Sequence, residues 1–596
     1  MQPGAFYIKR LDHLQQQRGA LKNKKAILAW LRFATVAAFA ASVYFLFPFG
    51  WPYIFISGLI AATIFTRLVF TDLKNKAGLE NNNFLITINE NEVKALEHNY
   101  YQFADGKEFG PKEHAFANDL DIFGHASLFQ FINRTRSDMG SARLANWLLN
   151  PADVKDVLAR QAAVKELAKQ TEWRQQLEGF GAAKKIQNET CMRLADWFND
   201  ENRFINNKTW MVLRLLVPSV MLIVIALNIA GVVDNYTRNY FLLAAALFAF
   251  YVSSKVTPIH NQVGRIAAEL EVLEDSIRLI EETNFESEFL KKLKLQFSDK
   301  NEKASAKIRH LKKVLERLDL RLNFVVFIPL DILFQWDLQQ VIALEKWKQQ
   351  NKENVMHWFD ALGSFEAISS FATLSFNHPQ WCFPAFKGEH FFIEGKAVGH
   401  PLIQIDKRVN NPIAINKAGE LMLVTGSNMA GKSTYLRSIG INTILAMAGA
   451  PVCAEYFCLS PVQLISSMRI ADNLEESTST FYAELKKLKT IIDKVNNNER
   501  VFILLDEILR GTNSMDRHTG SVALVRQLIK HNASGIIATH DVELARMRED
   551  YPANILNHHF DVQVNNDELY FDYQLKEGIC TSMNASILMK KIGIEL

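Results

Sequence analysis

The sequence predicts a C-terminal α/β domain built around a phosphate-binding loop, preceded by a mainly α-helical region that carries two transmembrane helical hairpins. Three observations predict this fold class. The segment Gly419–Arg437 reads GELMLVTGSNMAGKSTYLR and places a glycine-rich loop between an apolar strand and a helix. Two pairs of apolar runs lie within residues 27–70 and 212–256, and each run is about 20 residues long, enough to cross a bilayer. Residues 263–320 are highly charged with helical apolar periodicity, which predicts long, exposed helices.

The glycine-rich loop has the residue types that hold a triphosphate. Gly426, Gly431, Lys432 and Ser433 have the spacing G-x-x-x-x-G-K-[ST]. Glycines let consecutive backbone N–H groups turn inward around a polyphosphate, while Lys432 reaches the β- and γ-phosphates and Ser433 offers its hydroxyl to Mg²⁺. The helix that follows adds the positive end of its dipole. We therefore predict that the nucleotide is bound by Gly426, Ser427, Asn428, Met429, Ala430, Gly431, Lys432, Ser433 and Thr434.

Two adjacent carboxylates follow a second apolar strand. Val501–Leu505 is a fully apolar run, typical of a central parallel strand, and Asp506 and Glu507 come directly after it. The carboxyl ends of such strands are where open α/β sheets bind ligands. Asp506 is therefore expected to hold Mg²⁺, directly or through water, and Glu507 to orient or deprotonate the attacking water.

Two weaker signals lie downstream of the loop. His540 ends a third apolar strand and can reach a γ-phosphate, although a single histidine at a strand end is usually structural. The hydroxyl cluster Ser477–Thr480 opens an amphipathic helix. These hydroxyls could cap that helix, or they could donate hydrogen bonds to a phosphate on a neighbouring subunit.

Taken together, these motifs resemble those of a known family. In order and spacing, TGSNMAGKSTYLR, ADNLEESTSTFYAEL, LLDEILRGTNSMD and ATHD look like the ATPase domain of the MutS family of DNA mismatch-repair ATPases. The resemblance runs from about Gly399 to the C-terminus, and a second patch, Ser127–Pro151, resembles the start of the family's helical core. The implied fold is an α/β P-loop ATPase domain of the ABC/MutS type behind a helical core and lever region.

The resemblance also implies an activity and partners. It implies an ATPase that uses ATP and Mg²⁺ and forms a head-to-tail homodimer. Each site would combine Lys432, Asp506 and Glu507 of one chain with Ser479 of the other, and His540 would assist catalysis. The nucleotide state would be relayed through helical levers to DNA.

The apolar runs predict a multi-pass protein of the cytoplasmic (inner) membrane. Lys and Arg crowd the outer ends of the first pair of runs, whereas its connecting turn has none, so both ends and the ATPase domain should face the cytoplasm. A buried helical hairpin of a soluble core is the alternative. The five cysteines show no C-x-x-C spacing, which argues against a zinc site or a disulfide framework and fits a reducing compartment.

The organisation follows from these signals. The expected domains are the basic N-terminus with the first hairpin (residues 1–75), the first part of the helical core (76–208) and the second hairpin (209–256). The helical lever region (257–375) and the ATPase domain (376–596) follow. Further elements expected are a short strand at Phe84–Ile88, helices at Asp119–Asn150, Val154–Gln170, Trp336–Ser375 and Ala585–Lys591, and a strand at Leu569–Tyr573.

Two functions remain open at this point. The first is a membrane-anchored, ATP-dependent DNA-binding switch of the mismatch-repair family. The second is a membrane-tethered ATPase switch that acts on a protein partner without reading mismatches. The N-terminus holds a hairpin where soluble family members carry a mismatch-reading domain with a Phe-x-Glu motif, and the net charge is only +3, so any DNA surface must be local. An ABC-type transporter is a weaker third possibility because four spans are few.

Overall fold

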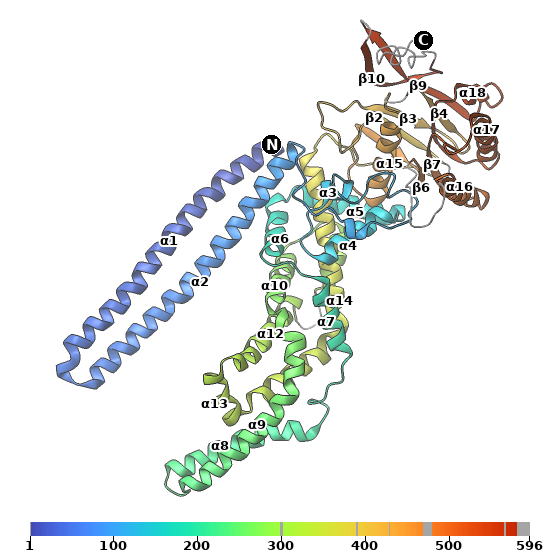
Figure 1. Ribbon diagram of the computed structural model, residues 1–596. Helices are drawn as coiled ribbons and strands as arrows, with labels where there is room; N and C mark the ends of the chain where they lie inside the picture. The colour runs from blue at the N-terminus through green and yellow to red at the C-terminus, as the bar shows by residue number, and fades with distance from the viewer. Residues whose placement is uncertain are drawn as a thin grey trace.

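The computed structural model describes residues 2–298, 302–388, 391–427, 430–468, 480–565 and 568–580. A helical body joins an α/β domain to two helical prongs, α1–α2 and α8–α9, and both prongs point away from the α/β domain (Figure 1). The fold therefore separates the predicted phosphate loop from the two apolar hairpins.

The first prong is an antiparallel pair of long helices. Its elements are α1 (Pro3–Leu46), the 3₁₀ turn η1 (Phe47–Phe49) and α2 (Trp51–Leu96). The predicted strand at Phe84–Ile88 is wrong, because this segment lies inside α2. Asn82, Ile86 and Asn89 recur at helical spacing on the buried face of α2, and their packing overrides the local preference of Ile and Thr for strand. Helix α2 also runs through the domain boundary expected at residue 75.

The helical body starts with five short helices. They are α3 (Leu128–Ile132), α4 (Asp138–Leu149), α5 (Val154–Ala168), α6 (Thr171–Ala183) and α7 (Asn188–Asn199). The helix expected over Asp119–Asn150 is thus broken into two. Ser127 caps α3 by accepting from the Gln130 N–H, and Ser137 caps α4 by accepting from the Gly140 N–H. The helix expected from Val154 is confirmed as α5.

The second prong and the lever follow. They comprise α8 (Lys208–Ile229), α9 (Asn235–Val263), η3 (Gly264–Ile266), α10 (Ala267–Glu282), α11 (Glu288–Leu295), α12 (Ala304–Leu318), η4 (Asp319–Leu322), α13 (Phe324–Phe334) and α14 (Trp336–Asn377). Helices α10 and α12 pack side by side. The prediction of long, exposed helices here is wrong: α10 and α12 have 16 and 15 residues, and each buries an apolar face in the helical body. The lever expected over Trp336–Ser375 is a single 42-residue helix, α14.

Several helices have the length and apolar character of membrane spans. In the described part of the chain, α1 with η1, α2, α8 and α9 are long and apolar enough to cross a bilayer. A fifth segment passes the same test if α13 and α14, which meet at an 80° bend, are counted as one broken span. This finding rests on length and composition alone.

The α/β domain contains two sheets. The larger has strand order β10-β9-β4-β8-β7-β6, in which all neighbours are parallel except the antiparallel pair β9–β10. The smaller has order β1-β5-β2-β3. The strands are β1 (Ala385–Phe386), β2 (Ile393–Val398), β3 (Asn411–Ile415), β4 (Leu421–Thr425), β5 (Tyr456–Leu459), β6 (Gln463–Ser467), β7 (Val501–Asp506), β8 (Ser534–Thr539), β9 (Ile555–Asn565) and β10 (Glu568–Glu577).

Four helices and one 3₁₀ turn complete this domain: α15 (Lys432–Ala448), α16 (Thr480–Asn496), α17 (Ser514–Lys530), α18 (Val542–Ala545) and η5 (Arg546–Arg548). The strand expected at Leu569–Tyr573 is confirmed within β10. The helix expected at Ala585–Lys591 lies outside the described residues.

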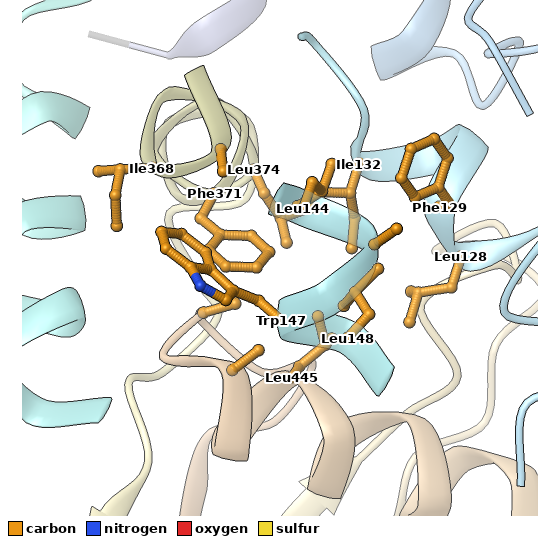
Figure 2. Close-up of a cluster of buried hydrophobic side chains, with 14 of the residues drawn as sticks. Leu128, Phe129, Ile132, Leu144, Trp147, Leu148, Ile368, Phe371, Leu374 and Leu445 are labelled. Atoms are coloured by element: carbon orange, nitrogen blue, oxygen red, sulfur yellow. The ribbon is translucent and has the colours of Figure 1, made fainter. Parts of the chain in front are cut away.

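One hydrophobic core unites the helical body with the α/β domain. Trp147 of α4 stacks on Phe371 of α14 with ring centroids 6.1 Å apart, and Leu445 of α15 lies beneath them (Figure 2). Phe371 and Leu445 are completely buried in the same hydrophobic core, and α4 packs on both the lever α14 and the phosphate-loop helix α15. Because such interiors are close-packed, displacing α15 requires α4 and α14 to adjust.

Candidate nucleotide-binding site

Three parallel strands bring the predicted site residues to one edge of the larger sheet. Thr425, the last residue of β4, pairs with Thr539 of β8, and Asp506 of β7 pairs with Ala538. Gly426, Glu507 and His540 follow these strand ends directly, so the phosphate loop, the acidic pair and the histidine lie close together. This arrangement confirms the expected order of strand, loop and helix.

The two loop glycines adopt backbone conformations that other residues avoid. Gly426 has φ +145° and Gly431 has φ +106°. A Cβ atom on Gly426 would lie 2.8 Å from the carbonyl oxygen of Phe560, and one on Gly431 would lie 3.1 Å from the Tyr573 ring. Glycine is therefore required at Gly426 by both backbone conformation and space. Helix α15 starts at Lys432, so its N-terminal N–H groups face the loop.

Lys432 is almost fully buried at the centre of the loop. Its ammonium donates to the carbonyl oxygens of Gly426 (2.8 Å) and Ser427 (3.0 Å), and its Nζ lies 3.3 Å from Nε2 of His540. Burial lowers its pKa from 10.5 to about 8, against the opposing attraction of Glu507 and Asp506. The lysine is thus a desolvated cation that phosphate oxygens would stabilise.

Glu507 links the acidic strand end to the histidine. Its Oε1 lies 2.6 Å from His540 Nε2, and its Oε2 lies 3.1 Å from Nε of Arg510. The His540 hydrogen bond and then the Arg510 charge lower the pKa of the Glu507 carboxyl, so this group is an anion at neutral pH. Its backbone has φ +52°, a strained conformation for a residue with a side chain, held by a hydrogen bond from its N–H to the Ala538 carbonyl (2.9 Å).

Asp506 has a buried oxygen available for a metal ion. The residue is 6% exposed, and its Oδ1 has no hydrogen-bond partner among the described residues. Arg510 lies 3.8 Å from the other oxygen. An unsatisfied buried carboxylate oxygen is costly unless a cation or a water molecule pairs with it. Together with the Ser433 hydroxyl at the start of α15, this oxygen fits the hard oxygen ligands that Mg²⁺ requires.

A cavity of about 510 Å³ opens in front of the loop. Ser427, Gly431, Lys432, Ser433, Thr434 and Glu507 line it, as expected for a nucleotide site. Ala430 is buried, and neither it nor Asp506 nor His540 is among the residues that line the cavity. Asn428, Met429 and Ser479 lie outside the described residues.

The far wall of this cavity consists of residues that sequence reasoning missed. They are His400, Asn411, Tyr435, Phe560 and Tyr573, together with Val398, Ile403, Lys407, Val409 and Ser438. His400 belongs to Gly399–Ile403, the segment at which the family resemblance begins, so the sequence did contain one indication of its role. Burial lowers its pKa to about 4, so the ring is neutral at physiological pH. Phe560 and Tyr573 come from β9 and β10, and no local motif marks them.

Fold and site together define a P-loop nucleotide-binding protein with an acidic strand end suited to Mg²⁺ and a helical lever that shares a hydrophobic core with its loop helix. Comparison with protein-family models identifies the family within this class. Residues 114–324 match the model of MutS domain III, and residues 422–592 match that of MutS domain V. The two matches cover more than half of the chain, in the order expected from the sequence, and the protein belongs to the MutS family.

Curated relatives support this assignment. The chain is 33% identical over 195 residues to MutS protein homolog 4 of Mus musculus, and 32% identical over 204 residues to MutS protein homolog 4 of Homo sapiens. It is also 32% identical over 197 residues to the DNA mismatch repair protein MSH4 of Arabidopsis thaliana. These alignments cover 31–33% of this chain but only 20–24% of the relatives. Members of the MutS family are ATPases that use ATP and Mg²⁺, bind DNA and form dimers.

Proposed function

We propose that this protein is a membrane-anchored MutS-type ATPase, in which ATP binding and hydrolysis switch the helical levers and thereby control contact with DNA. The observation that carries the proposal is the grouping of Lys432, Glu507 and His540 beside a 510 Å³ cavity. ATP hydrolysis requires a phosphate-binding loop, a lysine that binds the phosphates and an ionised carboxylate near the attacking water. All three lie at one edge of the larger sheet.

The residues divide the chemistry between them. The loop backbone and Lys432 hold the triphosphate, while Asp506 and Ser433 would hold Mg²⁺, which neutralises phosphate charge when bound. Glu507, kept anionic by His540 and Arg510, orients or deprotonates the attacking water. His540 Nε2, 2.6 Å from Glu507 Oε1, donates to the carboxylate and orients it. Removing Lys432 should therefore stop turnover at ATP binding, whereas removing Glu507 should stop it at hydrolysis of the bound ATP.

We further propose that two chains act as a homodimer. Ser479, from the hydroxyl cluster before α16, would complete the site of the partner subunit. The cavity is not enclosed, and Ser433, Thr434 and Glu507 are among the residues that line it. A second domain could therefore close over a nucleotide without displacing the loop.

The membrane role rests on the two prongs. The exposed apolar side chains of the first prong include Trp30, Phe45, Trp51 and Phe55, each at least 65% exposed. Such a surface is stable in lipid and not in water. Both prong tips point away from the α/β domain (Figure 1), so both hairpins can enter one bilayer while the nucleotide site stays outside it. The expected location is the cytoplasmic membrane, with the ATPase domain in the cytoplasm.

A second candidate is an ATP switch whose target is another protein. The segment that joins α10 to α12 favours it, because the eight-residue helix α11 is the only helix in its described residues, 283–298 and 302–303. A DNA clamp formed there would need further structure from the partner subunit or another protein.

The test is ATPase activity of the full chain in lipid nanodiscs, with and without single-stranded, duplex and branched DNA. The proposal expects activity that Lys432→Ala abolishes, and DNA binding that weakens steeply with added salt. Activity without any DNA binding at low salt, in every nucleotide state, would favour the protein-partner candidate. Unchanged nucleotide affinity in Lys432→Ala would refute the proposed site itself.

A further inference from the structure

Helix α13 and the turn before it present an apolar surface at the base of the second prong. Leu322, Phe324, Val325 and Ile328 are 71%, 72%, 84% and 50% exposed. The acidic residue of this helix faces inward: Asp331 is buried and accepts a hydrogen bond from the Asp337 N–H at 2.9 Å. The outer face of α13 is therefore left almost wholly apolar.

Hydrogen bonds fix the start of α13 to helix α9. Arg321, in the turn just before α13, donates through Nη2 to the hydroxyls of Ser253 (3.0 Å) and Thr257 (2.8 Å). The same guanidinium lies 3.4 Å from the buried carboxylate of Asp337. The start of α13 is therefore held beside the Ser253–Thr257 turn of α9.

The end of α13 is fixed in a similar way. Gln335, with φ +52°, ends the helix and bends the chain by 80° into α14. One turn later, Gln339 donates to the carbonyl of Arg214 in α8 at 2.6 Å. Both ends of α13 are thus held at the same end of the α8–α9 hairpin, the end away from its tip.

Aromatic and basic residues mark this end of the hairpin as a bilayer boundary. The Trp210 ring stacks on Phe248 and Tyr251 at 6.1 and 6.2 Å, and the ammonium of Lys255 lies 5.0 Å from the centre of the Tyr251 ring. Trp, Tyr and snorkelling Lys gather where hydrocarbon meets water. The ends of α13 lie within a turn or two of these residues along α8 and α9.

We propose that α13 is a membrane-surface helix whose exposed face lies at the boundary of headgroups and acyl chains, beside the α8–α9 hairpin, in the leaflet nearer the ATPase domain. At 11 residues it is about 16 Å long, too short for a hydrocarbon core of about 30 Å, and its two ends leave on the same side. Its apolar surface is continuous with that of the hairpin, because α13 packs on both α8 and α9. The inference rests on the proposed membrane anchoring.

The test places a nitroxide spin label on the full chain in nanodiscs and measures its collisions with oxygen, which concentrates in lipid, and with a water-soluble nickel chelate. Cys382 and Cys580, the two cysteines that are only partly buried, are first replaced by serine. Labels at Val325→Cys on α13, Leu247→Cys on α9 and Leu295→Cys on α11 are then compared; all three positions are exposed in the free chain.

The inference expects the label at 325 to lose nickel collisions relative to 295 and to gain oxygen collisions, at a shallower depth than 247. If 247 is in lipid but 325 is in water, α13 is not a membrane helix and the anchoring proposal survives. If 247 is also in water, the anchoring proposal itself fails. A label at 325 that is shielded from both reagents would show that protein covers α13, which overturns the inference in favour of a second copy or another partner.

Discussion

Raising the pH through 8 should weaken nucleotide binding, because the buried Lys432 loses its proton there. Its ammonium has carbonyl oxygens and a histidine ring nitrogen around it and little water. Burial lowers the pKa from 10.5 to about 8, which corresponds to about 3 kcal/mol of destabilisation of the charged form. Phosphate oxygens that bind the ammonium would reverse this shift.

The magnitude follows from proton linkage. Below pH 8 the lysine is already charged, so binding needs no proton. Above pH 8 the free protein must take up a proton before Lys432 can pair with phosphate, and the apparent affinity falls about tenfold for each pH unit. Nucleotide should therefore bind about tenfold more weakly at pH 9 than at pH 7.

Isothermal titration calorimetry with a non-hydrolysable nucleotide measures this effect directly. In two buffers of different ionisation enthalpy, the heats at pH 8.5 should show net uptake of most of one proton. Lys432→Arg is the matched control, because arginine stays charged and its pH profile should be flat whatever its affinity. Proton uptake near zero in the native protein, or an equal slope in the arginine variant, would refute the reasoning.

Three other predictions concern the same structure. Glu507→Gln should retain ATP but lose at least about a hundredfold in turnover, measured by single-turnover hydrolysis beside nucleotide binding; normal turnover would contradict it. Gly426→Ala should lose nucleotide binding because its Cβ would meet the Phe560 carbonyl at 2.8 Å, whereas Gly19→Ala, in helix α1 with open space around it, should not. Phe371→Ala should destabilise the shared core by about 3–5 kcal/mol, seen as faster amide exchange in α4 and α14; exchange unchanged there would count against it.

The grouping of the phosphate loop, the acidic pair and His540 could be predicted because its signals are local. A strand, a glycine loop and a helix lie within 19 residues, and the acidic pair follows an apolar run, so spacing alone indicated their roles. The opposite wall was not predictable in this way. Phe560 and Tyr573 reach the cavity through the pairing of β9 with β4 and with β10, which depends on strand register rather than on any short motif.

The apolar hairpins were predicted in part. The apolar runs lie in helices as expected, but α1 and α2 extend far beyond them. Polar residues hold the extension together: Asn75 donates to the Leu21 carbonyl at 3.0 Å, and Asn82 donates to Gln17 at 3.3 Å. Such cross-helix pairs have no hydrophobic signal, so hydropathy located the apolar part of the prong and missed its polar base.

Helix α14 joins the second prong to the nucleotide domain. It is 42 residues long, about 63 Å as a straight rod. Its first turn bonds to α8 through Gln339, and Phe371 near its other end packs in the core shared with α15. Because the helix is continuous between these points, a shift of α15 that displaced α4 and α14 would reach the base of the α8–α9 hairpin.

The first prong contacts the segment that carries one wall residue of the cavity. At the end of α2, a ring nitrogen of His98 lies 2.9 Å from the carbonyl of Leu402, beside Ile403 on the cavity wall. The base of this prong also meets the end of α14, where Tyr7 donates to Asn377 at 2.8 Å in a buried site. The first prong therefore contacts a residue next to the cavity wall, and the second prong is linked through α14 to the core that contains α15. If a bound nucleotide displaced both Ile403 and α15, the displacement would reach each hairpin through a separate set of contacts.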